Sequence, residues 1–301
     1  MWFTEAVLSA LLFGLAGWWM KVSQMRGGSS AYLLLGLYAS GTIGFGVHAI
    51  AEGTLAASLG DWRIWCAGVL IGAGSALGNA LFMKALECGP ASLTSPLTNM
   101  NIVLVVLLGT FVYREPFTGT ELVGVLLLLL AVLLISIRIQ DHASIRSGKW
   151  FGYVGVSMLL FAIRNGGLKV TEELGLSGAP VLFVAYALSI AWFGIPALRE
   201  RRAIRGTGPI RPGSSQRLAR AFRAPRIGYR LGLAAGLFSY GGLQLYTLSL
   251  QTGQANIAGP IFASNSLIVA IGSIVLYRER LTGRQWFAFT CLFAGLICIR
   301  L

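Results

Sequence analysis

The sequence predicts an all-α integral membrane protein with ten transmembrane helices, arranged as two inverted five-helix repeats. Three observations lead to this fold class: an apolar composition, ten apolar runs of membrane-spanning length, and an internal repeat that covers both halves of the chain.

Composition separates this chain from soluble proteins. Of its 301 residues, 55% are hydrophobic and 12% are charged, whereas a soluble domain carries charge at about a quarter of its positions. The 39 glycines are spread through the apolar runs, where small residues let helices pack closely in lipid. Cys66, Cys88, Cys291 and Cys298 have no paired spacing, so neither a zinc site nor a disulfide framework is expected.

Apolar runs long enough to cross a bilayer, at about 20 residues each, recur along the whole chain. They lie near residues 3–20, 31–50, 64–84, 91–112, 120–138, 150–169, 179–198, 228–250, 255–276 and 284–300. The first run has no basic segment before it and no cleavage site, so we expect a retained span and not a signal peptide. The one sizeable connector is a basic stretch at about 199–227, which leaves no room for a soluble domain.

The two halves of the chain are related by an internal repeat. A shift of 164 positions gives eleven identities in the 36 positions from 86 to 121; they pair Leu86, Gly89, Ala91, Pro96, Asn101, Val105, Tyr113, Arg114, Glu115, Thr118 and Gly119 with their mates 164 positions later. Upstream, the same shift pairs Ser75 with Ser239. A shift of 148 pairs Phe13 with Phe161 and Tyr38 with Tyr186.

The 16-residue difference between the shifts, 164 minus 148, identifies the basic connector as an insertion in the second copy. We therefore expect one repeat at 1–140 and a second at 149–301. Because five is odd, the second copy enters the membrane from the opposite side, and inverted repeats of this kind are typical of secondary transporters.

Basic residues indicate the orientation. The loops after the first, third, fifth, seventh and ninth spans hold 19 of the 24 lysines and arginines, which predicts that these loops are cytoplasmic and that both termini lie outside a cell membrane. The basic residues that give the net charge of +13 lie beside the spans, which argues against a nucleic-acid partner. Anionic membrane lipids are the expected partners of the basic connector; a solvated connector that only fixes the topology is the alternative.

Arg164 is the most informative single residue, because it follows Trp150 by about fourteen residues and so lies well inside the sixth span. An unpaired guanidinium there costs at least about 2.5 kcal/mol. We predict that Arg164 binds an anionic group of a substrate or a buried partner. Snorkelling toward the helix end near Lys169 is the alternative.

Polar side chains cluster in the fourth span and in its repeat mate, the ninth. The fourth contains Thr94, Ser95, Thr98, Asn99 and Asn101, and the ninth contains Asn256, Ser264, Asn265 and Ser266. Amides in lipid need partners, so they should face a cavity shared by the two halves; hydrogen bonding between helices without a substrate is the alternative. Tyr240 and Gln244 add polar surface within the eighth span, as a solute pocket requires.

Catalytic chemistry is not indicated. The only histidines, His48 and His142, fall near span ends or in loops, and no metal-binding spacing, nucleophile elbow or phosphate loop occurs. Glu5 is the one carboxylate that could carry a coupling proton, although its place at a helix start suits an interface better. We therefore expect no enzyme, no cofactor, no metal and no direct use of ATP.

The motifs resemble those of the drug/metabolite transporter superfamily, and within it the EamA-like ten-helix transporters. The resemblance rests on Ala85-Leu86, Gly89-Pro90-Ala91, Pro96-Leu97, Tyr113-Arg114-Glu115, Thr118-Gly119 and Gly124, and on their second copy from Leu250 to Gly283. It implies a central cavity lined by both repeats and the transport of amino acids, nucleobases, sugars or related metabolites, often outward. It also implies cytoplasmic termini, opposite to the charge bias.

The sequence is compatible with three functions. The first is an alternating-access carrier, an exporter or exchanger, for a small metabolite bound by Asn101, Asn265 and Arg164, with Asn99, Thr98, Ser264, Tyr240 and Gln244 as further candidates. The second is a lipid-handling protein that flips an anionic lipid. The third is a membrane subunit or chaperone that transports nothing. The complete double repeat favours a carrier, as a monomer or a homodimer.

Overall fold

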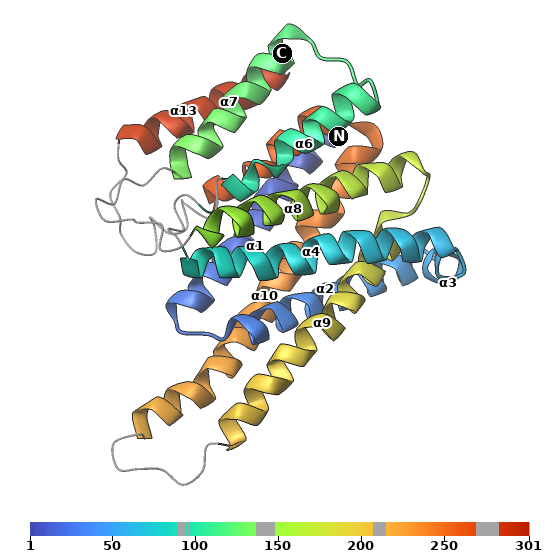
Figure 1. The fold of residues 1–301 in the computed structure, drawn as a ribbon. Coiled ribbons are helices and arrows are strands. Elements are labelled where there is room, and N and C mark those ends of the chain that lie inside the picture. The colour runs from blue at the N-terminus through green and yellow to red at the C-terminus, as the bar shows by residue number, and fades with distance from the viewer. Residues whose placement is uncertain (89–93, 95–96, 137–147, 207–214, 269–282, 301) are drawn as a thin grey trace.

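A computed structural model describes residues 1–88, 94, 97–136, 148–206, 215–268 and 283–300 (Figure 1). These residues form helices and no strands, as α1 (Trp2–Met25), α2 (Ser30–Ala51), α3 (Leu55–Leu59), α4 (Trp62–Cys88), α6 (Asn101–Leu107), η1 (Leu108–Val112), α7 (Gly119–Ser136), α8 (Lys149–Glu173), α9 (Gly178–Gly206), α10 (Ser215–Thr252), α11 (Ala255–Ala263) and α13 (Gly283–Arg300). The all-α class is confirmed.

Length and composition qualify five of the described helices as membrane spans: α1, α2, α4, α8 and α9, the last two over 149–173 and 178–204. Shorter apolar helices occupy Leu97–Val112, Gly119–Leu134 and Trp286–Ile299. Each apolar run expected from the sequence overlaps one of the described helices. The chain is a multi-pass membrane protein.

The basic connector differs from its prediction. Residues 199–227 are largely helical, because α9 continues to Gly206 and α10 already begins at Ser215. Arginine is a good helix former, so the two helices extend past their apolar parts. Figure 1 shows these extensions side by side at the lower left.

Several predicted residues lie outside the described part of the chain. They are Gly89, Pro90, Ala91, Ser95, Pro96, His142 and the second-copy motif Tyr277-Arg278-Glu279 with Thr282.

Helices from the two halves of the chain interleave. The main contacts join α1 with α10, α10 with α2, α4 with α8, α2 with α9, and α4 with α9, while α7 packs with α13 and also contacts α11 (Figure 1). Gly74 lets α4 approach α8, because a Cβ there would lie 2.7 Å from the Leu160 carbonyl oxygen and 3.1 Å from the backbone nitrogen of Arg164. This close contact fixes α8 beside the centre of the bundle.

The bundle has two ends of different charge. At the end that we call the basic end, α1 finishes at Met25, Ser29 donates a hydrogen bond to Glu200 at 2.6 Å, and α10 begins. At the opposite end, which we call the acidic end, lie Glu115 and Glu173. The central helices run between these two ends.

Candidate functional site

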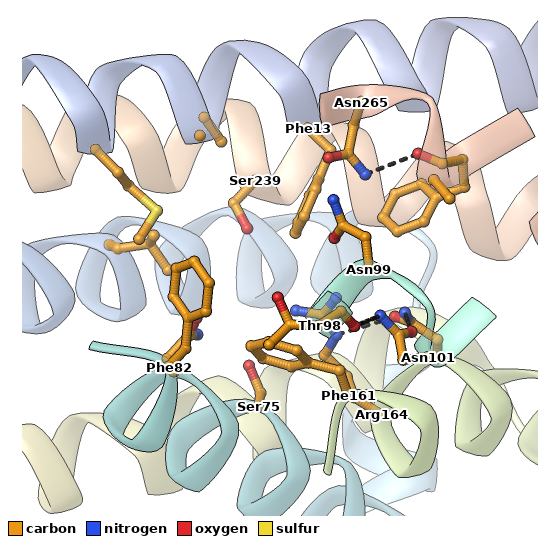
Figure 2. A pocket seen from close by; sticks show the side chains of 18 of the residues that line it. Phe13, Ser75, Phe82, Thr98, Asn99, Asn101, Phe161, Arg164, Ser239 and Asn265 are labelled. Carbon is orange, nitrogen blue, oxygen red and sulfur yellow. Dashed lines mark hydrogen bonds between the residues drawn. The ribbon is translucent and has the colours of Figure 1, made fainter. Parts of the chain in front are cut away.

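A cavity of about 140 Å³ lies between the two halves of the chain. Its polar and tyrosine lining consists of Tyr38, Ser75, Asn79, Thr98, Asn99, Asn101, Arg164, Asn165, Tyr186, Ser239 and Asn265, and its phenylalanines are Phe13, Phe82, Phe161 and Phe262. Figure 2 shows Asn99 and Asn265, one from each half, pointing toward each other. Five of the eight predicted site residues therefore line one cavity: Thr98, Asn99, Asn101, Arg164 and Asn265.

Two helices are interrupted at equivalent places beside this cavity. A break at Met100 precedes α6, and α11 ends where Ser264 forms a turn. Each break frees a carbonyl that a nearby asparagine binds, because Asn101 Nδ2 donates to the Thr98 oxygen and Asn265 Nδ2 donates to the Phe262 oxygen, both at 2.7 Å. Broken helices are tolerated inside a membrane where they line a cavity.

Arg164 is held by a relay of amides. Its Nε donates to Asn165 Oδ1 at 3.0 Å, and Asn165 Nδ2 donates to Asn101 Oδ1 at 2.8 Å. The guanidinium also lies 5.3 Å from the ring centre of Phe13 and 5.1 Å from that of Phe161. The relay therefore orients the charged group at the cavity wall (Figure 2).

Two tyrosine–serine pairs, one from each half of the chain, contribute to the cavity wall. The Tyr38 hydroxyl is 2.8 Å from Ser75 Oγ, and the Tyr186 hydroxyl is 2.7 Å from Ser239 Oγ. Asn79 Nδ2 donates to the Tyr38 hydroxyl at 2.9 Å. The sequence repeat relates Tyr38 to Tyr186 and Ser75 to Ser239, so the two halves build the same feature twice.

An aromatic stack borders the cavity on the side toward the acidic end. The ring of Phe262 lies 4.9 Å from Phe13 and 4.4 Å from Tyr246, between ring centres. Tyr246 is fully buried. The lining residues of α1 and α4 run from Phe13 to Met20 and from Ser75 to Phe82, so they occupy the middle of each helix and the part toward the basic end.

Glu115 binds three groups at the acidic end. Its two carboxylate oxygens accept hydrogen bonds from the backbone nitrogens of Ala255 at 2.9 Å and Asn256 at 2.8 Å, where α11 begins. Lys169 Nζ lies 3.1 Å from Glu115 and 2.6 Å from Glu173. An anion is favourable at a helix N-terminus, so Glu115 ties the first half of the chain to α8 and α11.

The turn that carries Glu115 is unusual. Arg114 has φ of 53°, the one positive φ outside glycine in the described part of the chain; such backbone strain persists where the surrounding contacts hold it. Beside it, burial raises the pKa of the Tyr113 hydroxyl above its usual value, and the Glu173 carboxylate adds to this rise. The Tyr113 hydroxyl therefore stays neutral next to the ion pairs.

Three predicted site residues lie away from the cavity. Tyr240 and Gln244 contact the two ring nitrogens of His48, at 3.1 and 3.0 Å, because they lie on a different face of α10 from Ser239. Ser264 donates to the Ile261 carbonyl at 2.6 Å and is satisfied within its own turn.

Sequence reasoning had not placed Ser75, Asn79, Ser239, Phe13 and Phe161 in the site. Four of them belong to repeat-related pairs, so identity across the repeat was the signal that could have found them. Within the described residues, no group of three or more metal-ligating side chains occurs that could hold an ion.

Comparisons with known proteins agree with this architecture. The model of a family described as the EamA-like transporter family matches residues 1–137 and 179–301. A solved structure titled "Crystal structure of protein" is similar in fold, with a TM-score of 0.69 and 14% sequence identity over 98% of this chain and 96% of that chain. No curated protein matches the chain.

Proposed function

Because this chain belongs to the EamA-like transporter family, and is thus a membrane transporter of small solutes, we propose that it carries a small metabolite across the cell membrane by alternating access. The observation that supports this most is the cavity shared by the two halves and lined by repeat-related residues from both.

The helix contacts support an inverted repeat as the basis of the mechanism. Under the two sequence shifts, α1 corresponds to α8, α2 to α9, α4 to α10 and α7 to α13. The contact of α1 with α10 then corresponds to that of α8 with α4, and the contact of α2 with α10 to that of α9 with α4. Two copies related in this way can exchange conformations, opening one end of the cavity and then the other.

The two ends of the cavity differ in closure, which supports an assignment of the conformation. Toward the acidic end stand the stack of Tyr246, Phe262 and Phe13 and, beyond it, the ion pair of Glu115 with Lys169. We infer that this conformation is open toward the basic end. By the lysine and arginine bias the basic end is cytoplasmic, so the solute would enter from the cytoplasm and leave as an export or exchange substrate.

Counterflow in liposomes tests the proposal. Purified protein is reconstituted in liposomes. The liposomes are loaded in turn with amino acids, nucleosides, sugars and organic acids, and the exchange of the labelled compound is measured. Exchange of at least one solute is expected. Movement of a fluorescent anionic lipid without exchange of any solute would favour the lipid-handling alternative, and no movement of either would favour a subunit or chaperone.

A matched pair of substitutions connects the flux to the cavity. Asn99→Trp places an indole in the cavity and should abolish counterflow, whereas Ile43→Trp places one at a position that is 66% exposed on the bundle surface and should leave it intact. Both variants are first compared by gel filtration, because overpacking can disturb folding. Equal counterflow by the two variants would contradict passage through this cavity.

A further inference from the structure

We propose that the cavity binds a small organic monoanion, a carboxylate attached to an apolar body, with the Arg164 guanidinium as its counter-ion. This inference rests on the transporter function proposed above and names the substrate class of that site.

Arg164 is a buried cation that has no counter-charge among the described residues. Its relative exposure is 8%, and no aspartate or glutamate of the described residues forms an ion pair with it. A guanidinium has five N–H donors, and the one hydrogen bond found for Arg164 uses Nε. No described residue accepts a hydrogen bond from Nη1 or Nη2, so these donors are available to a ligand.

The orientation of the guanidinium is fixed before any ligand arrives. Asn165 accepts from Nε and is itself held by Asn101, whose Nδ2 binds the Thr98 carbonyl. A planar guanidinium held in this way matches the two oxygens of a carboxylate, which it can bind with two parallel hydrogen bonds. Asn165 and Asn101 are therefore positioning residues for the anion site.

Three pairs of repeat-related positions in the cavity wall differ in polarity. At the shift of 148, Arg164 and Asn165 correspond to Ala16 and Gly17, which also line the cavity. At the shift of 164, Asn99 corresponds to Ala263. The wall formed by Asn99, Asn101 and α8 is thus polar and cationic, whereas α1 and α11 contribute apolar residues and Asn265 follows shortly after α11.

This polarity defines the ligand. A carboxylate would lie against Arg164, and its apolar body would lie along the adjacent rings of Phe13 and Phe262. The volume of about 140 Å³ is close to that of a cavity of about 150 Å³ that holds benzene. One aromatic ring or a branched aliphatic chain is therefore the expected body.

The charge of the ligand follows from the lining. Arg164 is the one cationic side chain among the described lining residues, and none of those residues is acidic. A single cation neutralises a single negative charge, which disfavours a phosphate dianion. An α-ammonium group would find no carboxylate there, so we expect the cavity to prefer a simple organic acid over the corresponding amino acid.

Three compounds with one skeleton test this inference by binding to the purified full-length protein. Phenylacetate carries only the carboxylate, phenylacetamide replaces it with a neutral amide, and phenylglycine adds an α-ammonium group. Titration calorimetry is expected to give binding of phenylacetate at least about tenfold tighter than binding of either relative, the range that hydrogen bonds to a charged group provide.

Substitutions then assign the binding to Arg164. Arg164→Gln should weaken phenylacetate binding by about 10–100-fold, Arg164→Lys less, and Asn165→Ala by a smaller factor through loss of orientation. Arg63→Gln is the control, because Arg63 is exposed and pairs with Asp61 at 2.7 Å, away from the cavity; it should bind phenylacetate as the wild type does. Should Arg164→Gln fail to fold, the Lys and Asn165 variants still decide the question.

Several results would overturn the inference: no binding of phenylacetate, equal binding of phenylacetamide, tighter binding of phenylglycine, or full retention of binding by Arg164→Gln. Counterflow of a neutral solute by Arg164→Gln would leave the transporter function standing and remove only the anion site. Absence of counterflow for every solute class would instead remove the transporter function.

Discussion

Helix α8 carries two buried cations five positions apart, at 164 and 169, in opposite surroundings. Lys169 is paired with Glu115 and Glu173 at the acidic end, whereas the Arg164 guanidinium at the cavity donates one hydrogen bond to a neutral amide and contacts two phenylalanine rings. A cation that the protein itself neutralises stabilises one arrangement of helices. A cation left without a counter-charge destabilises the empty protein and is suited to a ligand.

The largest effect on stability is expected from removing Glu115, the carboxylate that pairs with Lys169. Glu115→Ala removes a carboxylate whose side chain is 9% exposed, and leaves two backbone donors of α11 unbound. Breaking a buried pair on one side costs about 3–5 kcal/mol. We expect a lower midpoint of thermal unfolding in detergent. We also expect that a cysteine introduced into the cavity is labelled faster from the acidic end.

Glu121→Ala is the matched control for that experiment. The Glu121 carboxylate also binds at a helix start, where it accepts a hydrogen bond from the Thr118 nitrogen at 2.7 Å, but this hydrogen bond is exposed. Its loss should lower the midpoint by a small fraction of the Glu115 effect, since exposed caps contribute about 1 kcal/mol. Equal shifts for the two variants would mean that Glu115 is an ordinary helix cap and not a tie between the halves.

Removing the charge of Arg164 should raise stability, whereas removing Glu115 should lower it. Arg164→Met removes a charge that costs about 2.5 kcal/mol or more in a bilayer, so the ligand-free variant should melt at a higher temperature than the wild type while losing counterflow of organic acids. Differential scanning fluorimetry without ligand measures this. A lower midpoint for Arg164→Met would assign Arg164 a structural role instead.

A smaller effect is expected from a single hydroxyl in the cavity. Tyr186→Phe removes the 2.7 Å hydrogen bond to Ser239, and Tyr240→Phe removes the 3.1 Å contact with His48 outside the cavity. Tyr186 lines the cavity, and one hydrogen bond from its hydroxyl to the solute would contribute about 1 kcal/mol, or roughly fivefold in affinity. The transport KM should rise about fivefold for Tyr186→Phe and stay unchanged for Tyr240→Phe; the reverse order would place the solute near His48.

The smallest effect should come from the exposed pair of Asp61 with Arg63. Hydrogen bonds from the Arg63 side chain and then its backbone N–H lower the pKa of Asp61 below its ordinary value of 3.8. Because the folded pKa is depressed, the stabilisation exists above that ordinary value and is lost as the pH falls through the folded pKa. Exposed ion pairs stabilise little, so the midpoint of Asp61→Asn should equal that of the wild type between pH 5 and pH 8, as a melting series would verify.

Much of the fold could be predicted from the sequence, because length and polarity decide which segments can lie in lipid. Each expected apolar run overlaps a described helix. The short helix α3 and the continuation of α9 to Gly206 were not predicted, because an apolar run predicts only the part of a helix that lies in lipid. A helix that emerges from the bilayer depends on propensity and capping, and no sharp composition change marks where it ends.

The site was predictable in part. Asn101, Asn265 and Arg164 could be found because a polar group in an apolar span needs a partner or a cavity. Tyr240 and Gln244 obey the same rule, but their partner is His48, and the sequence does not show which face of α10 they occupy. Glu115 was noted only as part of a repeated motif, because its partner Ala255 lies 140 positions away.

The central claim is that a polar cavity inside the membrane is reached from one end at a time. Thiol labelling of Asn99→Cys, with the four native cysteines replaced, tests it most directly; Ser249→Cys is the control, because Ser249 is buried and does not line the cavity. An impermeant reagent should modify Asn99→Cys from the basic end in the resting protein, and from the acidic end only while solute is exchanging. Equal labelling from both ends at rest, or no labelling from either end during exchange, would contradict the account.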